Sequence, residues 1–150
     1  MAPAFVGRKA ELALLDDIYS RSKREERPAA VLITGLPGSG KTRLLSEFRR
    51  RQGASPQLNM AGYQTGTQVP LAAAGDLLRT LSKVPGAGSK LDEALFGTAP
   101  SDDRPLEPLR IFEAAHRALL GLTGTVLLCI DDLQWVDELS LALCSCGRQQ

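Results

Sequence analysis

Residues 35–42, which read GLPGSGKT, are the clearest candidates for a chemical role because of their types and spacing. They match the phosphate-binding pattern G-x-x-x-x-G-K-[ST]. The preceding segment, 29–34, is a short apolar run typical of a strand, and the following segment, 43–50, carries apolar residues at helical spacing. In a turn between a strand and a helix, backbone N–H groups point at one spot, where the helix dipole also favours negative charge. The sequence therefore predicts a site for a phosphate group.

Each residue type in this loop suits a different part of phosphate binding. Gly35, Gly38 and Gly40 can adopt positive φ angles and let the backbone approach phosphate oxygens without an intervening Cβ. Lys41 offers a mobile positive charge to the β and γ phosphates, which makes it a candidate catalytic residue, and the Thr42 hydroxyl can coordinate Mg²⁺. The spacing G-x-x-G-x-G argues against a dinucleotide-binding fingerprint. The set predicted to bind nucleotide in this loop is Gly35, Gly38, Ser39, Gly40, Lys41, Thr42 and Arg43.

A second candidate site lies further along the chain, where the apolar run 125–130 ends in Asp131 and Asp132. This pattern is typical of a parallel strand that is buried on both faces and carries acids at its carboxyl end, where ligands bind in open α/β sheets. Asp131 is predicted to hold Mg²⁺, largely through water, and Asp132 is predicted to orient or deprotonate an attacking water. The alternative is a turn at the end of the strand whose acids are simply solvated.

Three motifs together resemble a known family. Residues 5–12 read FVGRKAEL, residues 35–42 read GLPGSGKT and residues 130–143 read IDDLQWVDELSLAL. In this order they resemble the amino-terminal part of a STAND-type AAA ATPase domain, in the form found in large ATP-binding regulators of the LuxR type. The resemblance implies a signal-transduction ATPase that switches between nucleotide states and is usually joined to helical repeats and a helix-turn-helix DNA-binding domain.

The resemblance also implies a fold and further site residues. The fold is an α/β P-loop NTPase sandwich of three layers, with a parallel sheet of five core strands, of which this chain supplies candidates for about three. Val6, Gly7 and Arg8 would lie against the adenine, although Arg8 could be an ordinary helix-start residue. Trp135 and Asp137 would belong to the segment after the second motif, and for Trp135 we favour core packing or an interdomain contact.

Residues 1–143 are accordingly interpreted as the amino-terminal part of the ATPase domain, and residues 144–150, where the apolar period stops, as a frameshifted or truncated tail. A P-loop strand without its family neighbours would keep unpaired backbone groups, which favours self-association or pairing with the remaining domain parts. The predicted function is a Mg-ATP-binding, slowly hydrolysing switch module of a LuxR-type regulator. The alternatives are a non-catalytic remnant that binds nucleotide weakly or not at all, and a small P-loop kinase.

The composition of the chain limits which other classes of function are open to it. The 150 residues include 18 basic and 17 acidic side chains, a balance that argues against direct nucleic-acid contact by this segment. No apolar run reaches the roughly 18 residues that span a bilayer, and no export signal is visible, so we expect a cytoplasmic protein without membrane contact. Cys129 is predicted to pack as a small hydrophobe, Cys144 and Cys146 form an isolated pair, and His116 is expected at the margin of the core.

Periodicity predicts the elements that position these residues. Helices are expected over residues 8–24, 70–81 and 105–120, and a strand over residues 57–61. Residues 84–104 have the composition of a surface excursion with a short helix at 91–96. The side chains expected to face the core are Leu12, Leu15, Ile18 and Tyr19 in the first helix, Leu77 and Leu78 in the second, and Leu109, Phe112, Leu119 and Leu120 in the third.

Overall fold

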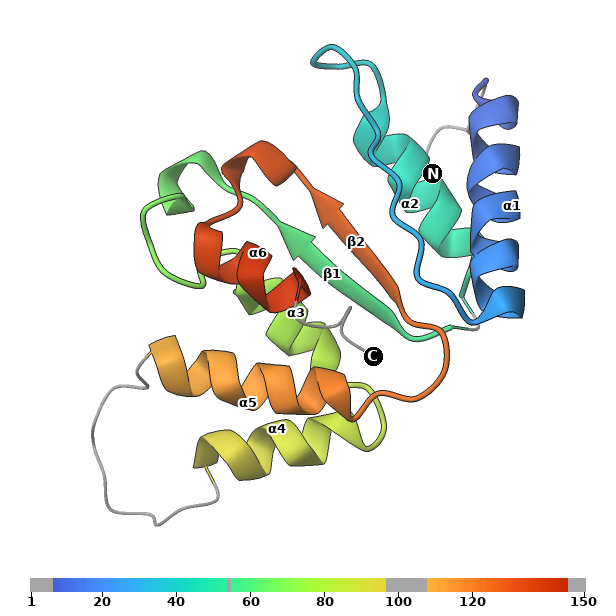
Figure 1. Cartoon of the computed structure of the whole chain (residues 1–150). Helices are drawn as coiled ribbons and strands as arrows, with labels where there is room; N and C mark the ends of the chain where they lie inside the picture. The colour runs from blue at the N-terminus through green and yellow to red at the C-terminus, as the bar shows by residue number, and fades with distance from the viewer. Residues whose placement is uncertain (1–6, 54, 97–107, 146–150) are drawn as a thin grey trace, which may run out of the picture. The chain divides into compact units, whose positions relative to one another are not determined.

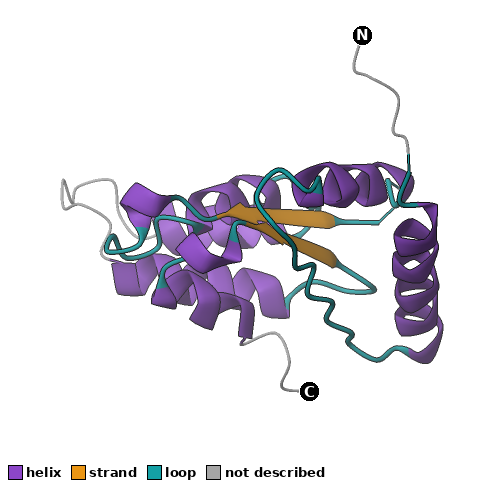
Figure 2. Ribbon diagram, turned by 90° about the horizontal axis from the view of Figure 1, so that it is seen from above, coloured by secondary structure: helices purple, strands orange, loops and turns teal. Residues whose placement is uncertain are grey.

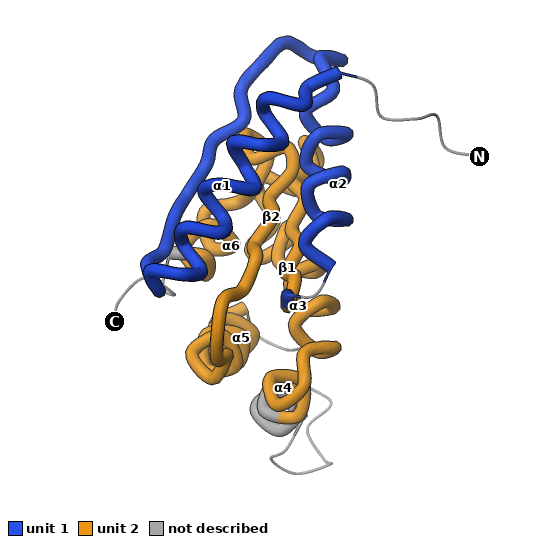
Figure 3. Tube along the Cα trace, turned by 90° about the vertical axis from the view of Figure 1, so that its right-hand side faces the viewer, with its two compact units in different colours: residues 1–55 blue, residues 56–150 orange. Residues whose placement is uncertain are grey.

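The computed structural model describes residues 7–53, 55–96 and 108–145 (Figure 1). The chain divides into two compact units, residues 1–55 and residues 56–150, which are coloured separately in Figure 3. We describe each unit by itself. No helix within the described ranges is long and apolar enough to cross a membrane.

The described residues of the first unit form two helices, α1 (Lys9–Glu25) and α2 (Lys41–Arg51). Leu12 and Leu15 of α1 are buried as predicted, and Ile18 and Tyr19 are partly buried. The Tyr19 ring meets the Phe48 ring of α2 edge to face, with the ring centroids 6.0 Å apart. The helical period of the apolar residues therefore places the inner face of α1 against α2.

Residues 29–34 do not form the predicted strand. Val31 and Leu32 are 46% and 71% exposed, and no strand among the described residues pairs with this segment. A strand requires a neighbour that exchanges backbone hydrogen bonds with it, and apolar composition alone does not supply one. The expectation of about three strands is wrong for the same reason, because the described part of the chain forms a sheet of two.

The sheet belongs to the second unit and consists of β1 (Gln57–Ala61) and β2 (Leu127–Asp131), which lie side by side and parallel (Figures 1 and 2). The predicted strand 57–61 is confirmed, and the strand predicted at 125–130 begins two residues later. Side chains alternate between the faces of a strand, so Cys129 is buried, as predicted, while Leu128 is 36% exposed. The predicted burial of both faces of β2 is therefore wrong at Leu128.

Four helices and two 3₁₀ turns make up the rest of the second unit as far as the structure describes it. The helices are α3 (Ala74–Leu81), α4 (Ala87–Phe96), α5 (Pro108–Leu120) and α6 (Glu138–Ser145), and the turns are η1 (Gln64–Gly66) and η2 (Leu133–Trp135). Their buried side chains form one core with the strands. This core consists of Leu58, Met60, Leu71, Ala73, Ala74, Leu77, Leu81, Ala87, Leu91, Ala114, Ala115, Ala118, Val136 and Leu143.

Two predicted elements before α5 begin elsewhere. Helix α3 begins at Ala74 and not at Pro70, because Leu71 has a φ of 61°, in the left-handed region that a helix does not use. Helix α4 begins at Ala87, and Ala87 and Leu91 are only 1% and 2% exposed. The segment predicted as a surface excursion therefore supplies core residues up to Leu91, and residues 97–104 lie outside the described residues. Leu77 is buried as predicted, whereas Leu78 is only partly buried.

The inner face of α5 differs from the predicted one. Leu109 and Leu120 are 65% and 53% exposed, so their predicted burial is wrong. The buried positions of this helix are Ala114, Ala115 and Ala118, whose small side chains suit a close approach between helices. Phe112 and Leu119 pack on the edge of the core, and His116 is partly buried beside Phe112, as predicted for a core-margin residue.

Candidate functional site

The glycine-rich loop lies in the first unit and leads directly into α2. Gly38 and Gly40 have φ angles of 75° and 87°, a conformation that residues with a Cβ rarely adopt. The Ser39 amide donates a hydrogen bond to the Leu36 carbonyl at 3.1 Å, which closes a turn. The Leu44 amide then donates to the Gly40 carbonyl at 2.9 Å and begins the helical pattern. The loop therefore ends at the amino terminus of α2, the positive end of the helix dipole.

The Lys41 side chain folds back over this loop. Its Nζ donates hydrogen bonds to the Gly35 carbonyl at 3.0 Å and to the Leu36 carbonyl at 3.1 Å. The Ser39 Oγ is buried and has no hydrogen-bond partner among the described residues. A Cβ built on Gly35 would lie only 2.8 Å from this oxygen, so a side chain at position 35 would collide with the Ser39 hydroxyl. An ammonium, a buried hydroxyl without a partner and a helix amino terminus together fit a phosphate group.

Arg8 connects the start of α1 to the same loop. Its guanidinium donates a hydrogen bond to the Ser39 carbonyl at 2.6 Å and forms an ion pair with Glu11 at 3.4 Å. Arg8 is also the N-cap residue of α1, with a φ of 52°, so it occupies the helix-start position as well as contacting the loop. Gly7, with a φ of 83°, precedes it. Val6, the third residue predicted to lie against the adenine, is outside the described residues.

The acidic pair lies in the second unit, at the carboxyl end of β2 as predicted. Asp131 is the last residue of β2, and its Oδ1 accepts a hydrogen bond from the Asp132 amide at 3.1 Å. Asp132 has a φ of 48° and turns the chain into η2, while its Oδ1 accepts a hydrogen bond from Gln134 Nε2 at 3.2 Å. The structure thus brings the loop glycines, Lys41 and Arg8 together in one unit, and the two acids together in the other.

Protein ligands for a metal ion are few. Across the described ranges, no group of three or more His, Cys, Asp or Glu side chains could hold a metal ion. Mg²⁺ commonly takes one or two carboxylates and completes its octahedron with water and phosphate oxygens, and the predicted use of Thr42 and Asp131 as its ligands stays a prediction. Cys144 is a poor nucleophile or ligand, since burial raises the pKa of its thiol to about 11.

Asp137 is a structurally important residue whose role the sequence analysis did not identify. It is 4% exposed, and its carboxylate accepts hydrogen bonds from the Leu71 amide at 2.8 Å and the Ala73 amide at 3.1 Å. It also accepts from the Ser140 amide at 3.0 Å and the Ser140 hydroxyl at 2.7 Å. Burial raises the pKa of Asp137, but the hydrogen bonds from Ser140, Ala73 and Leu71 outweigh burial and hold it below its ordinary value. Asp137 stands just before the apolar residues of α6, and Asp is a preferred N-cap residue, so this pattern could have predicted its role at the start of the helix.

The segment between the acids and Asp137 packs closely on the end of β1. The Gly62 amide donates a hydrogen bond to the Asp131 carbonyl at 3.0 Å. A Cβ on Gly62 would lie 2.7 Å from the carbonyl carbon of Trp135 and 2.8 Å from the Val136 nitrogen, so only glycine fits. Trp135 itself is 36% exposed. Its predicted core packing is therefore wrong, and an interdomain contact stays a prediction.

Comparison with known families decides the class of this loop. The profile described as "AAA ATPase domain" matches residues 4–146. The chain belongs to this AAA ATPase family. The match covers the loop in the first unit and the acids in the second, and it confirms the predicted AAA-type, nucleotide-binding class of the module. The same sequence matches no curated protein and no solved structure.

Proposed function

We propose that this AAA ATPase domain binds Mg-ATP through the loop before α2 and acts as the nucleotide-dependent switch of a STAND-type signal-transduction ATPase. The observation that carries the proposal is the loop itself. The Lys41 ammonium rests on the Gly35 and Leu36 carbonyls, beside a buried Ser39 hydroxyl without a partner in the described structure. Phosphate oxygens are stronger acceptors than these carbonyls, so a bound triphosphate would draw the ammonium toward itself.

The proposal gives each predicted site residue a role. Lys41 would neutralise charge on the β and γ phosphates, and Arg8 and Gly7 would contact the adenine side of the nucleotide. The residues that would supply ligands to Mg²⁺ are Thr42, through its hydroxyl, and Asp131, through its carboxylate, and the ion would neutralise developing charge on the phosphates. Asp132 would orient the attacking water. The loop residues that contact the phosphates are Gly35, Gly38, Ser39, Gly40 and Arg43.

We expect ATP turnover by the purified chain to be far slower than about 1 per second. In P-loop enzymes an arginine that stabilises the transition-state charge raises the rate about 10³- to 10⁵-fold, and the proposed site includes no residue in that role. Release of radiolabelled phosphate under single-turnover conditions measures the rate. Turnover near 1 per second would contradict the slow switch and favour a fast enzyme.

The proposal extends to the kind of regulator. The three motifs of this chain resemble those of LuxR-type regulators, so we propose that the switch belongs to such a regulator.

A further inference from the structure

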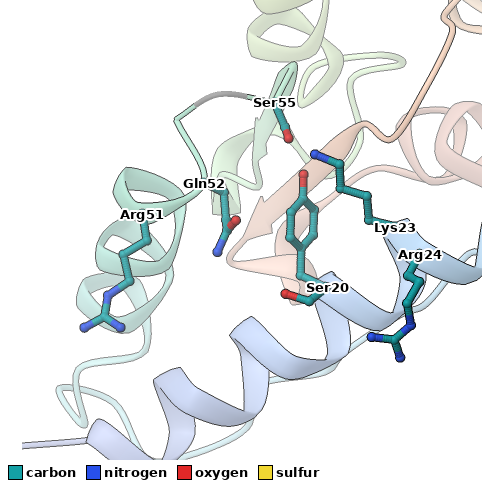
Figure 4. Close-up of a pocket in the computed structure, with 7 residues that line it drawn as sticks. Ser20, Lys23, Arg24, Arg51, Gln52 and Ser55 are labelled. Carbon is teal, nitrogen blue, oxygen red and sulfur yellow. The ribbon is translucent and has the colours of Figure 1, made fainter.

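The first unit contains a hollow of about 460 Å³ at the carboxyl-terminal ends of its two helices (Figure 4). Its lining is basic and polar and contains no carboxylate. The lining residues are Tyr19, Ser20, Lys23, Arg24, Arg51, Gln52 and Ser55. The hollow is separate from the phosphate loop, which lies at the opposite, amino-terminal end of α2.

Two groups in this hollow lack partners. The Tyr19 hydroxyl is buried and has no hydrogen-bond partner among the described residues. Leaving a buried hydroxyl unpaired is unfavourable, and such a group calls for a ligand, ion or water. The Lys23 side chain is exposed and forms no ion pair or hydrogen bond with any residue that the structure describes. Figure 4 shows its ammonium and the Ser55 hydroxyl pointing toward one another across the hollow.

The other two cations of the hollow already have acidic partners. Arg51 pairs with Asp16 at 3.2 Å and with Glu47 at 3.5 Å, and Arg24 pairs with Glu25 at 3.7 Å. Both guanidinium groups point away from the spot between Lys23 and Ser55 in Figure 4. Cations in the last turn of a helix also complement the helix dipole, so no bound ligand is needed to explain why the two arginines are there. Lys23 is therefore the charge available to a bound molecule.

We propose that this hollow binds the phosphate group of a small phosphomonoester. The Lys23 ammonium supplies the charge, and the hydroxyls of Tyr19 and Ser55 supply hydrogen bonds from two other directions, a set of donors that matches the several oxygens of a phosphate. The Lys23 ammonium sits on a flexible stem, so it can turn toward a ligand in the hollow. The volume of about 460 Å³ exceeds what a phosphate fills and leaves room for the rest of the ester. This site is independent of the proposed ATP site.

Calorimetric titration of the full chain with inorganic phosphate and with glycerol 3-phosphate tests the proposal. The titrations use Lys41→Ala protein, so that anion binding at the phosphate loop is weakened. We expect saturable binding, at least about tenfold weaker when Lys23→Met is added and about threefold to tenfold weaker when Tyr19→Phe is added. Tyr19→Phe keeps the ring that packs on Phe48, and Lys23 is exposed, so neither change should unfold the protein.

Lys9→Met is the matched control, because it removes the same charge from the other end of α1. We expect it to leave phosphate binding unchanged. The proposal is overturned if phosphate does not bind the Lys41→Ala protein, if Lys23→Met and Lys9→Met have equal effects, or if succinate binds more tightly than either phosphate compound.

Discussion

Replacing Asp137 by alanine is expected to destabilise the second unit by about 3 kcal/mol. The carboxylate is 4% exposed and accepts four hydrogen bonds, two of them from the residue 71–73 turn and two from Ser140. Its removal leaves buried donors without partners, removes the N-cap of α6 and releases Leu71 from its left-handed conformation. Urea unfolding of the full chain, followed by far-ultraviolet circular dichroism, measures the loss.

The control for this change is Asp92→Ala, which removes an exposed carboxylate from α4 and should alter the free energy of unfolding by no more than about 0.5 kcal/mol.

The Asp137→Asn variant keeps the shape of the side chain but removes its charge, so it measures what the charge contributes to stability. Because the folded-state pKa of Asp137 is lowered, the carboxylate stabilises the fold above its ordinary pKa of about 4, and this contribution disappears as the pH falls through the lower folded value. The difference between native and Asp137→Asn protein should therefore shrink below about pH 4. A pH-independent difference would contradict the charged role.

The parts of the fold that could be predicted from the sequence depend on local patterns. The loop between residues 35 and 42 combines glycine spacing with a helix that begins at Lys41, and the structure places it at that position. Residues 57–61 form the predicted strand, in which the buried Leu58 and Met60 alternate with more exposed side chains, and the continuous apolar run before Asp131 supplies the second strand. The acids follow the second strand, so their position at its carboxyl end was also predictable.

The parts that could not be predicted depend on contacts between distant residues. The α3 start is set by the Asp137 carboxylate, 66 positions from the Leu71 amide that it binds. Residues 29–34 are apolar, yet they form no strand, because no described strand exchanges backbone hydrogen bonds with them. Helix α5 turns three alanines inward and not its larger leucines, since the fit against its neighbours outweighs hydrophobicity. The roles of the loop residues and the acids stay predictions.

Replacing Lys41 by alanine is expected to weaken ATP binding about 10- to 100-fold. A charged hydrogen-bonding group contributes about 1.5–3 kcal/mol, and each 1.4 kcal/mol corresponds to a tenfold change in affinity. The structure shows that the ammonium is already positioned on the loop, with Nζ 3.0 Å from the Gly35 carbonyl oxygen. Because the contacts made by Lys41 are exposed, the substitution should not unfold the first unit. The loss should therefore appear in binding and not in stability.

Equilibrium titration with a fluorescent ATP analogue in the presence of Mg²⁺ tests the central claim most directly. The comparison includes the native chain, the Lys41→Ala variant and a Lys83→Ala control, which removes an exposed lysine from the second unit. The account predicts that native and Lys83→Ala protein bind with the same affinity and that Lys41→Ala binds about 10- to 100-fold more weakly. Equal affinity of the native chain and Lys41→Ala would contradict the assignment of this loop as the ATP site.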